Sequence, residues 1–120
     1  MELQVLENES NAALLHEAGV KVAIGSWSAD YGGSGKNTQG RWLMLEAALA
    51  SGFGMPPEAA LKAITINAAE ILGVADRVGS ITPGKDADLI VLDGPPLSVE
   101  TWVRMVLVNG RLVYERTADR

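Results

Sequence analysis

The sequence predicts an α+β fold in which a helical first part is followed by a small antiparallel β-sheet. Three observations lead to this prediction. Apolar residues recur at helical spacing over residues 41–52. An apolar run at residues 88–93 is typical of a strand. Asn109-Gly110 lies between two apolar segments, as in a β-hairpin.

The first predicted elements are a short helix and a short strand. Ser10 is a favourable N-cap for a helix that runs through Ala18, and Gly19 is a favourable stop. Residues 21–24 then predict a short buried strand. A buried strand of this kind needs neighbours on both sides, and the sequence supplies none nearby.

Three helices are predicted next. The apolar periodicity places the first at residues 41–52. Pro57 is expected in the first turn of the second, because proline is tolerated where a helix N–H has no partner. Asn67 is expected to be the N-cap of the third, with Glu70 completing a capping-box-like pair and Gly73 ending the helix.

The last third of the chain predicts a sheet. The run at residues 88–93 shows little polar alternation, so both of its faces are expected to be covered. Residues 102–108 and 111–115 are expected to pair as a hairpin. Asn109 and Gly110 favour a type I′ turn between them, because both tolerate positive φ.

A two-residue turn also predicts the register of this hairpin. The expected cross-strand pairs are Val108–Arg111, Leu107–Leu112, Val106–Val113, Met105–Tyr114 and Arg104–Glu115. The last pair joins opposite charges, and an exposed pair of this kind contributes only a few tenths of a kcal/mol.

Composition excludes several classes of protein. A net charge of −5 without a Lys/Arg run argues against a nucleic-acid partner. The chain has no cysteine, so it predicts neither a disulfide framework nor a thiolate metal site. No apolar run approaches the roughly 20 residues that span a bilayer, so no membrane partner is expected. Residues 1–4 lack a signal-peptide pattern, and a cytoplasmic location is the expectation.

Two glycine-rich segments resemble anion-binding loops. Residues 79–85 nearly match a phosphate-binding P-loop, but Asp86 stands where Ser or Thr would hold magnesium. A strand, not a helix, is also predicted to follow, so we favour an ordinary turn. Residues 32–36 could cradle an anion, and the alternative of a flexible loop is favoured.

Few side chains are suited to metal ligation or proton transfer. His16 is the only histidine, so a structural or solvated role is favoured over ligation. Asp86 and Asp88 could act as paired acid and base. Carboxylates before a strand also discourage edge pairing, and we favour that interpretation. Trp27 and Asp30 lie in the loop predicted after the first strand, and Asp30 is the only carboxylate of that loop.

Several separate motifs resemble those of the amidohydrolase superfamily. Residues 78–93 (VGSITPGKDADLIVLD) resemble its late β-strand signature, especially that of imidazolonepropionase-like and Xaa-Pro dipeptidase-like members. Further motifs agree in the same order: LEAAL at 45–49, PEAAL at 57–61, TINAAEILG at 65–73 and VLVNGRLVY at 106–114. The resemblance extends over about residues 12–116.

This resemblance implies the C-terminal portion of a TIM-type amidohydrolase. Residues 22–25 would be the last barrel strand, and residues 41–73 the helices that follow it. The chain would divide into a partial barrel segment, 1–77, and a partial segment of the accessory β-sandwich, 78–120. The family hydrolyses C–N bonds in cyclic amides and dipeptides with zinc or another divalent metal. The alternative fold is an independent α+β domain with a helical layer on a small antiparallel sheet.

The chain departs from the family pattern in two respects. A full barrel takes about 250 residues, and the metal-binding histidines of the family come from earlier strands. The last barrel strand of the family ends Gly-Thr-Asp, whereas this chain reads Gly25-Ser26-Trp27. Tryptophan neither binds a metal nor accepts a proton. We therefore expect no metal in the isolated chain and no catalytic residue apart from the candidate Asp30, which requires a redirected loop.

Three functional hypotheses follow from these observations. The chain is a truncated amidohydrolase-like protein that is inactive in isolation. Alternatively, it is one subunit of a two-chain enzyme, completed by a partner that supplies the missing barrel strands. The third hypothesis is a non-catalytic module that forms a homodimer through open sheet edges.

Overall fold

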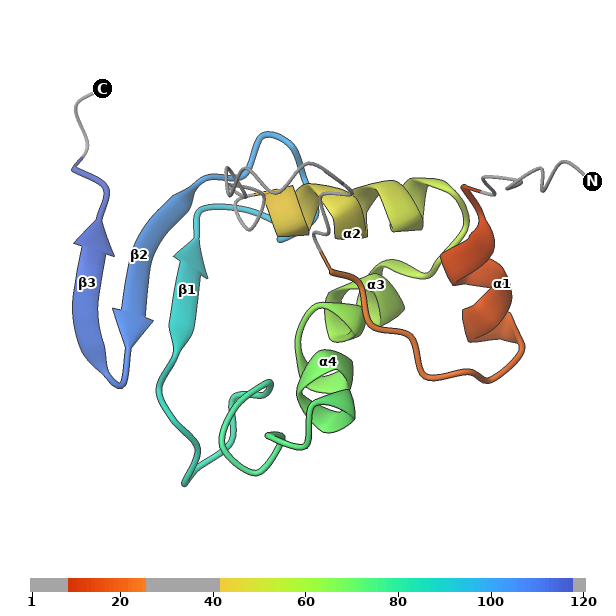
Figure 1. The fold of residues 1–120 in the computed structure, drawn as a ribbon. Helices are drawn as coiled ribbons and strands as arrows, with labels where there is room; N and C mark the ends of the chain where they lie inside the picture. The colour runs from red at the N-terminus through yellow and green to blue at the C-terminus, as the bar shows by residue number, and fades with distance from the viewer. Residues whose placement is uncertain (1–8, 26–41, 118–120) are drawn as a thin grey trace, which may run out of the picture.

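The computed structural model describes residues 9–25 and 42–117, and in these ranges four helices precede a three-stranded antiparallel sheet (Figure 1). The helices are α1 (Asn11–Glu17), α2 (Leu43–Gly52), α3 (Pro57–Ala63) and α4 (Ile66–Ile71). The strands are β1 (Leu89–Leu92), β2 (Val103–Val108) and β3 (Arg111–Glu115). The predicted α+β organisation is confirmed at this level. None of the described helices is long and apolar enough to cross a membrane.

The first three helices lie where the sequence predicts them. Helix α1 ends just before Gly19, which has a φ of 77° as expected for a helix stop. Ser10 occupies the N-cap position of α1 as predicted, although its side chain makes no capping hydrogen bond. Helix α2 ends at Gly52, and Pro57 opens α3 as the first-turn proline rule predicts.

The predicted N-cap of the fourth helix is wrong. Helix α4 begins at Ile66, with Thr65 in the N-cap position, so Asn67 lies inside the first turn. The Asn67 side-chain amide instead donates from Nδ2 to the Val22 carbonyl at 3.1 Å. This long-range partner, 45 residues away along the chain, accounts for a polar residue on a packed part of the helix.

Residues 21–24 do not form a strand with any other described residue, so the predicted strand is not observed. The segment passes beside α3 (Figure 1), where the Ile24 N–H donates to the Ala63 carbonyl at 3.0 Å. A strand needs a neighbouring strand to complete its hydrogen bonds, and residues 9–25 and 42–117 supply none at this position.

The core of the described residues consists of small side chains. Its buried members are Ala13, Ala47, Met55, Ala60, Ala63 and Ala69. Larger apolar side chains of α2 and α4 lie outside this core, including Leu49 at 48% exposure and Ile71 at 55%. The helices therefore pack closely through alanine and leave much of their bulky apolar surface uncovered by the described part of the chain.

The hairpin turn is confirmed, but its predicted register holds only beside the turn. Asn109 and Gly110 have φ values of 52° and 74°, as a type I′ turn requires. Val108 pairs with Arg111 and Leu107 with Leu112, as predicted. An irregularity then places one extra residue in β3, so the observed pairs become Val106–Tyr114 and Met105–Glu115. The predicted pairs Val106–Val113, Met105–Tyr114 and Arg104–Glu115 are wrong for this reason.

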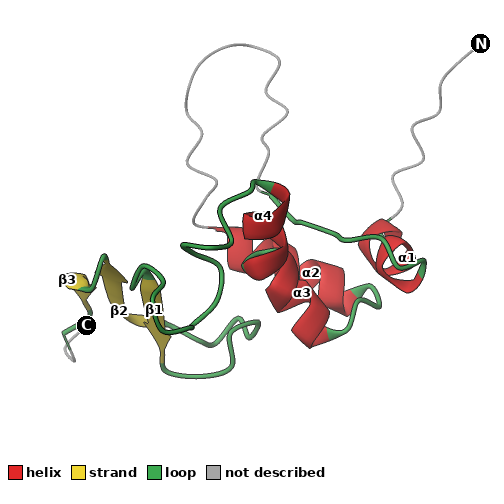
Figure 2. Ribbon diagram, turned by 90° about the horizontal axis from the view of Figure 1, so that it is seen from below, coloured by secondary structure: helices red, strands yellow, loops and turns green. Residues whose placement is uncertain are grey.

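The sheet is open on both faces among the described residues. Ile90 and Val91 of β1 are adjacent and so face opposite sides, and they are 57% and 38% exposed. The predicted coverage of both faces is therefore not observed. Every residue of β3 is exposed as well. Figure 2 shows the sheet as a single layer beside the helices, without a second sheet packed on it.

Candidate functional site

The residues that the sequence proposes for catalysis fall in two groups. Trp27, Asp30 and the glycine-rich segment at 32–36 lie outside the residues that the structure describes. The role of Asp30 therefore stays a prediction. The remaining candidates, His16, Asp86 and Asp88, are described and can be placed.

The aspartates near β1 have structural partners. Asp88 accepts a hydrogen bond at Oδ1 from the Asn109 N–H at 2.8 Å, which fastens the start of β1 to the hairpin turn. Asp86 forms an ion pair with Arg77 at 2.7 Å. Because each carboxylate serves a separate contact, the arrangement favours the structural interpretation over a paired acid and base.

Asp93 has an equivalent role at the other end of β1. Its Oδ1 accepts a hydrogen bond from the Trp102 N–H at 2.8 Å, and its own N–H donates to the Trp102 carbonyl at 3.2 Å. The two ends of β1 are thus both fastened by an aspartate. The sequence signature around β1 reflects this local architecture.

The P-loop-like segment is a self-contained turn. Lys85 donates from Nζ to the Ser80 hydroxyl at 2.7 Å, and the Ser80 and Thr82 hydroxyls lie 3.0 Å apart. Gly79 packs against α4 so closely that a Cβ there would meet the Ala69 Cβ at 2.6 Å. The lysine is occupied inside the loop and β1 follows, so the geometry favours the predicted turn over a phosphate site.

The described residues do not fit the divalent metal that the family resemblance implies. His16 is exposed on α1. Within residues 9–25 and 42–117, no three histidine, cysteine, aspartate or glutamate side chains gather as a ligand set. Zinc requires three or four such ligands, so this part of the chain does not form its site. The expected absence of a metal from the whole isolated chain remains a prediction.

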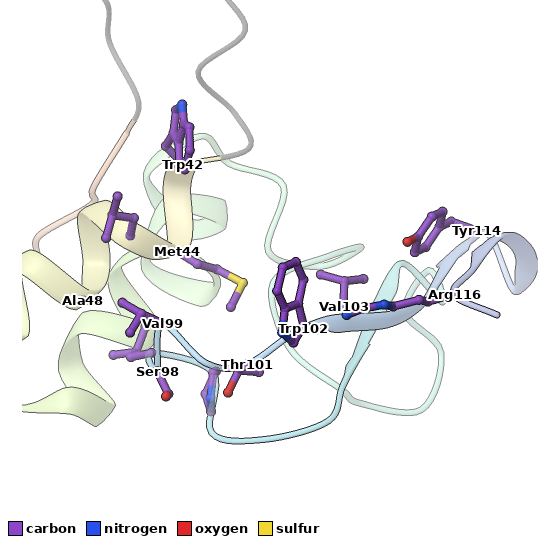
Figure 3. A pocket seen from close by; sticks show the side chains of 13 residues that line it. Trp42, Met44, Ala48, Ser98, Val99, Thr101, Trp102, Val103, Tyr114 and Arg116 are labelled. Atoms are coloured by element: carbon purple, nitrogen blue, oxygen red, sulfur yellow. The ribbon is translucent and has the colours of Figure 1, made fainter. Parts of the chain in front are cut away.

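An apolar groove of about 560 Å³ lies between α2, the β1–β2 loop and the last strand (Figure 3). Its lining includes Trp42, Met44, Val99, Trp102, Tyr114 and Arg116. The Arg116 guanidinium lies 4.3 Å from the centroid of the Trp102 ring, a cation–π contact.

The chemistry available in this groove is limited to packing and hydrogen bonding. Among the described residues of its lining, Arg116 is the only charged one, and none is a carboxylate or a histidine. The groove can therefore hold apolar groups, and among the described residues of its lining the Tyr114 phenol is the only side chain suited to general acid–base chemistry. Trp42 and Trp102 lie 60 positions apart in the sequence, and nothing in this spacing shows that they line one groove.

The helices and the antiparallel sheet, without a complete catalytic centre among the described residues, define an α+β chain. The sequence model of the amidohydrolase family matches residues 4–113, and this chain belongs to that family. The family resemblance stated from the motifs is confirmed.

Individual relatives agree with this assignment. An imidazolonepropionase from Fusobacterium nucleatum is 29% identical over 118 residues, which cover 93% of this chain and 28% of the relative. An imidazolonepropionase from Shouchella clausii is 37% identical over 92% of this chain and 25% of the relative. The crystal structure of an amidohydrolase from Thermotoga maritima superposes with a TM-score of 0.78 at 36% identity, covering 91% of this chain and 27% of that one. The chain spans about a quarter of the length of these relatives.

Proposed function

We propose that this chain forms the C-terminal portion of a metal-dependent amidohydrolase acting on C–N bonds, and that it does not hydrolyse substrate by itself. The observation that carries the proposal is the match to about a quarter of each amidohydrolase relative. In those relatives most of the polypeptide lies outside the matched part. Imidazolonepropionases among them suggest a cyclic amide as substrate of the completed enzyme.

The side chains support the inactivity of the chain alone. Hydrolysis of a C–N bond requires an activated water and a group that transfers protons. The three aspartates around β1, Asp86, Asp88 and Asp93, are engaged in structural contacts: an ion pair for Asp86 and hydrogen bonds from backbone N–H groups for the other two. The groove beside α2 offers no acid or base apart from the phenol of Tyr114. The described residues therefore contribute structure to a hydrolytic fold.

A hydrolysis assay of the purified chain tests this proposal. The chain is incubated with zinc and with imidazolone propionate, a dipeptide and a cyclic amide, and we expect no turnover above buffer. Asp30→Ala is the informative variant, because Asp30 is the only candidate base, and Asp76→Ala serves as an exposed control. Turnover that disappears in Asp30→Ala and persists in Asp76→Ala would overturn the proposal.

The arrangement that completes the fold is part of the same proposal. Bulky apolar residues of α2 and α4 are exposed, and Leu72, directly after α4, is 75% exposed. Extended apolar surfaces of this kind are usually covered by another chain or segment. A separate polypeptide that supplies the missing strands would cover them.

We also propose a cytoplasmic location, supported by the absence of cysteine.

A homodimer is the second candidate, and the exposure of β3 favours it. This strand lies at the edge of the sheet, and Leu112, Val113 and Tyr114 are 48–60% exposed. An open apolar edge invites pairing with another chain. Sedimentation of the purified chain at micromolar concentration is expected to show a dimer, and a clean monomer would count against this candidate.

A further inference from the structure

Two arginines project from the same face of the sheet beside the apolar groove. The register of β2 and β3 pairs Val106 with Tyr114, and it continues beyond β3, where the Arg116 N–H donates to the Arg104 carbonyl at 2.8 Å. Arg104 and Arg116 are therefore directly opposite each other, and opposed residues of an antiparallel pair share one face. Tyr114 lies on this face too, because it is two residues from Arg116.

The charges on this face favour an anionic ligand. Like charges directly opposite each other destabilise a sheet. The Arg104 side chain is exposed and forms no ion pair with another described residue. Arg116 is partly buried and lies over the Trp102 ring at the end of the groove. A carboxylate beside these guanidinium groups would offset their repulsion, and arginine binds carboxylates through paired hydrogen bonds.

The remainder of the groove favours an apolar tail on that ligand. Its walls include Trp42, Met44 and Val99 (Figure 3). The hydroxyls of the lining are occupied by backbone groups, because Ser98 accepts from the Glu100 N–H at 3.3 Å and Thr101 donates to the Pro95 carbonyl at 2.6 Å. A volume of about 560 Å³ also lies within the range of about 300–1,000 Å³ that small-molecule sites occupy.

We propose that this groove binds a free fatty carboxylate, with its apolar tail between α2 and the β1–β2 loop and its carboxylate at Arg116 and Arg104. The charge of the two arginines and the apolar walls together match an anion with a hydrocarbon chain. This site takes no part in hydrolysis, so the result of its test is independent of the proposed function.

Isothermal titration calorimetry of the full chain separates the two parts of the ligand. The probes are decanoate, the uncharged decanol and the shorter octanoate. Decanoate is expected to bind at least about tenfold more tightly than decanol, because a hydrogen bond to a charged group contributes more than one to a neutral group. Octanoate is expected to bind about tenfold more weakly than decanoate, because it buries less hydrocarbon.

Arginine variants identify the carboxylate end of the site. Arg104→Gln and Arg116→Gln are each expected to weaken decanoate binding about tenfold and to leave decanol binding unchanged, which shows that the groove is intact. Arg111→Gln is the matched control, because Arg111 is exposed on the same sheet and is not part of the groove lining. It is expected to bind decanoate as the unsubstituted chain does.

Three results would overturn this proposal. The first is equal affinity for decanoate and decanol. The second is a pair of variants, Arg104→Gln and Arg116→Gln, that weaken decanoate no more than decanol. The third is no binding of decanoate at all, which includes the case in which a second copy of the chain covers the groove.

Discussion

Substitution of Gly79 by alanine tests whether the turn before β1 is held against α4 by close packing. A Cβ at this position would lie 2.6 Å from the Ala69 Cβ and 3.0 Å from the Ile66 Cα. Neither atom can move without moving α4, and overpacking of this kind costs about 1–3 kcal/mol. The φ of 93° adds about 1–2 kcal/mol for a residue with a side chain.

Gly84 provides the matched control for this measurement. Its φ is 92°, almost that of Gly79, but a Cβ there would meet nothing within 4 Å. The backbone cost and the entropy change of the unfolded chain are therefore shared by the two variants. Their difference in the free energy of unfolding isolates the packing contribution, expected at about 1–3 kcal/mol.

Urea denaturation followed by circular dichroism measures both variants against the unsubstituted chain. Gly79→Ala is expected to unfold at clearly lower urea concentration than Gly84→Ala. Equal midpoints for the two variants would refute the close contact between the turn and α4. Unchanged midpoints for both would also refute the need for glycine at these positive φ angles.

Three further predictions concern the sheet, the helices and the metal. Asp93→Ala removes the acceptor of the Trp102 N–H and is expected to lower stability by about 1 kcal/mol in urea denaturation, whereas the exposed Asp76→Ala leaves it unchanged. The exposed Glu58 carboxyl forms a hydrogen bond and an ion pair with Lys62 at 2.8 Å, and these contacts lower its pKa below the usual 4.5. The stabilisation from this pair is therefore present above the usual pKa and lost as pH falls through the lower folded value. In an NMR titration Lys62→Ala is expected to raise the Glu58 pKa, and an unchanged pKa would contradict the pairing. Added zinc is expected to leave the melting midpoint unchanged, because a ligand that binds only the folded chain would raise it.

Local sequence signals predicted the elements whose causes are local. Pro57 set the start of α3, and Gly19 the end of α1, because both depend on backbone conformations of single residues. The Asn109-Gly110 turn was predicted for the same reason. The motif at residues 78–93 pointed to the family that the comparisons then established.

Features that depend on distant partners were not predictable from local signals. Asn67 has the properties of an N-cap, but its amide is used by Val22, and no local pattern reveals that contact. The extra residue of β3 changes the register without any glycine or proline to mark it. The aromatic groove brings Trp42 and Trp102 together through the tertiary fold. Asp30, the candidate base, lies outside the described residues, so its role is left to the hydrolysis assay.

The alanine-rich interior has a consequence for how this chain would tolerate change. Five of the six buried apolar residues in the described part of the chain are alanines. Any larger residue there would force helices apart, whereas the leucines and isoleucines outside have room to vary. Substitutions in this interior are therefore limited by the volume of the side chain. Further stabilisation by apolar burial is available mainly at the exposed surfaces that another polypeptide would cover.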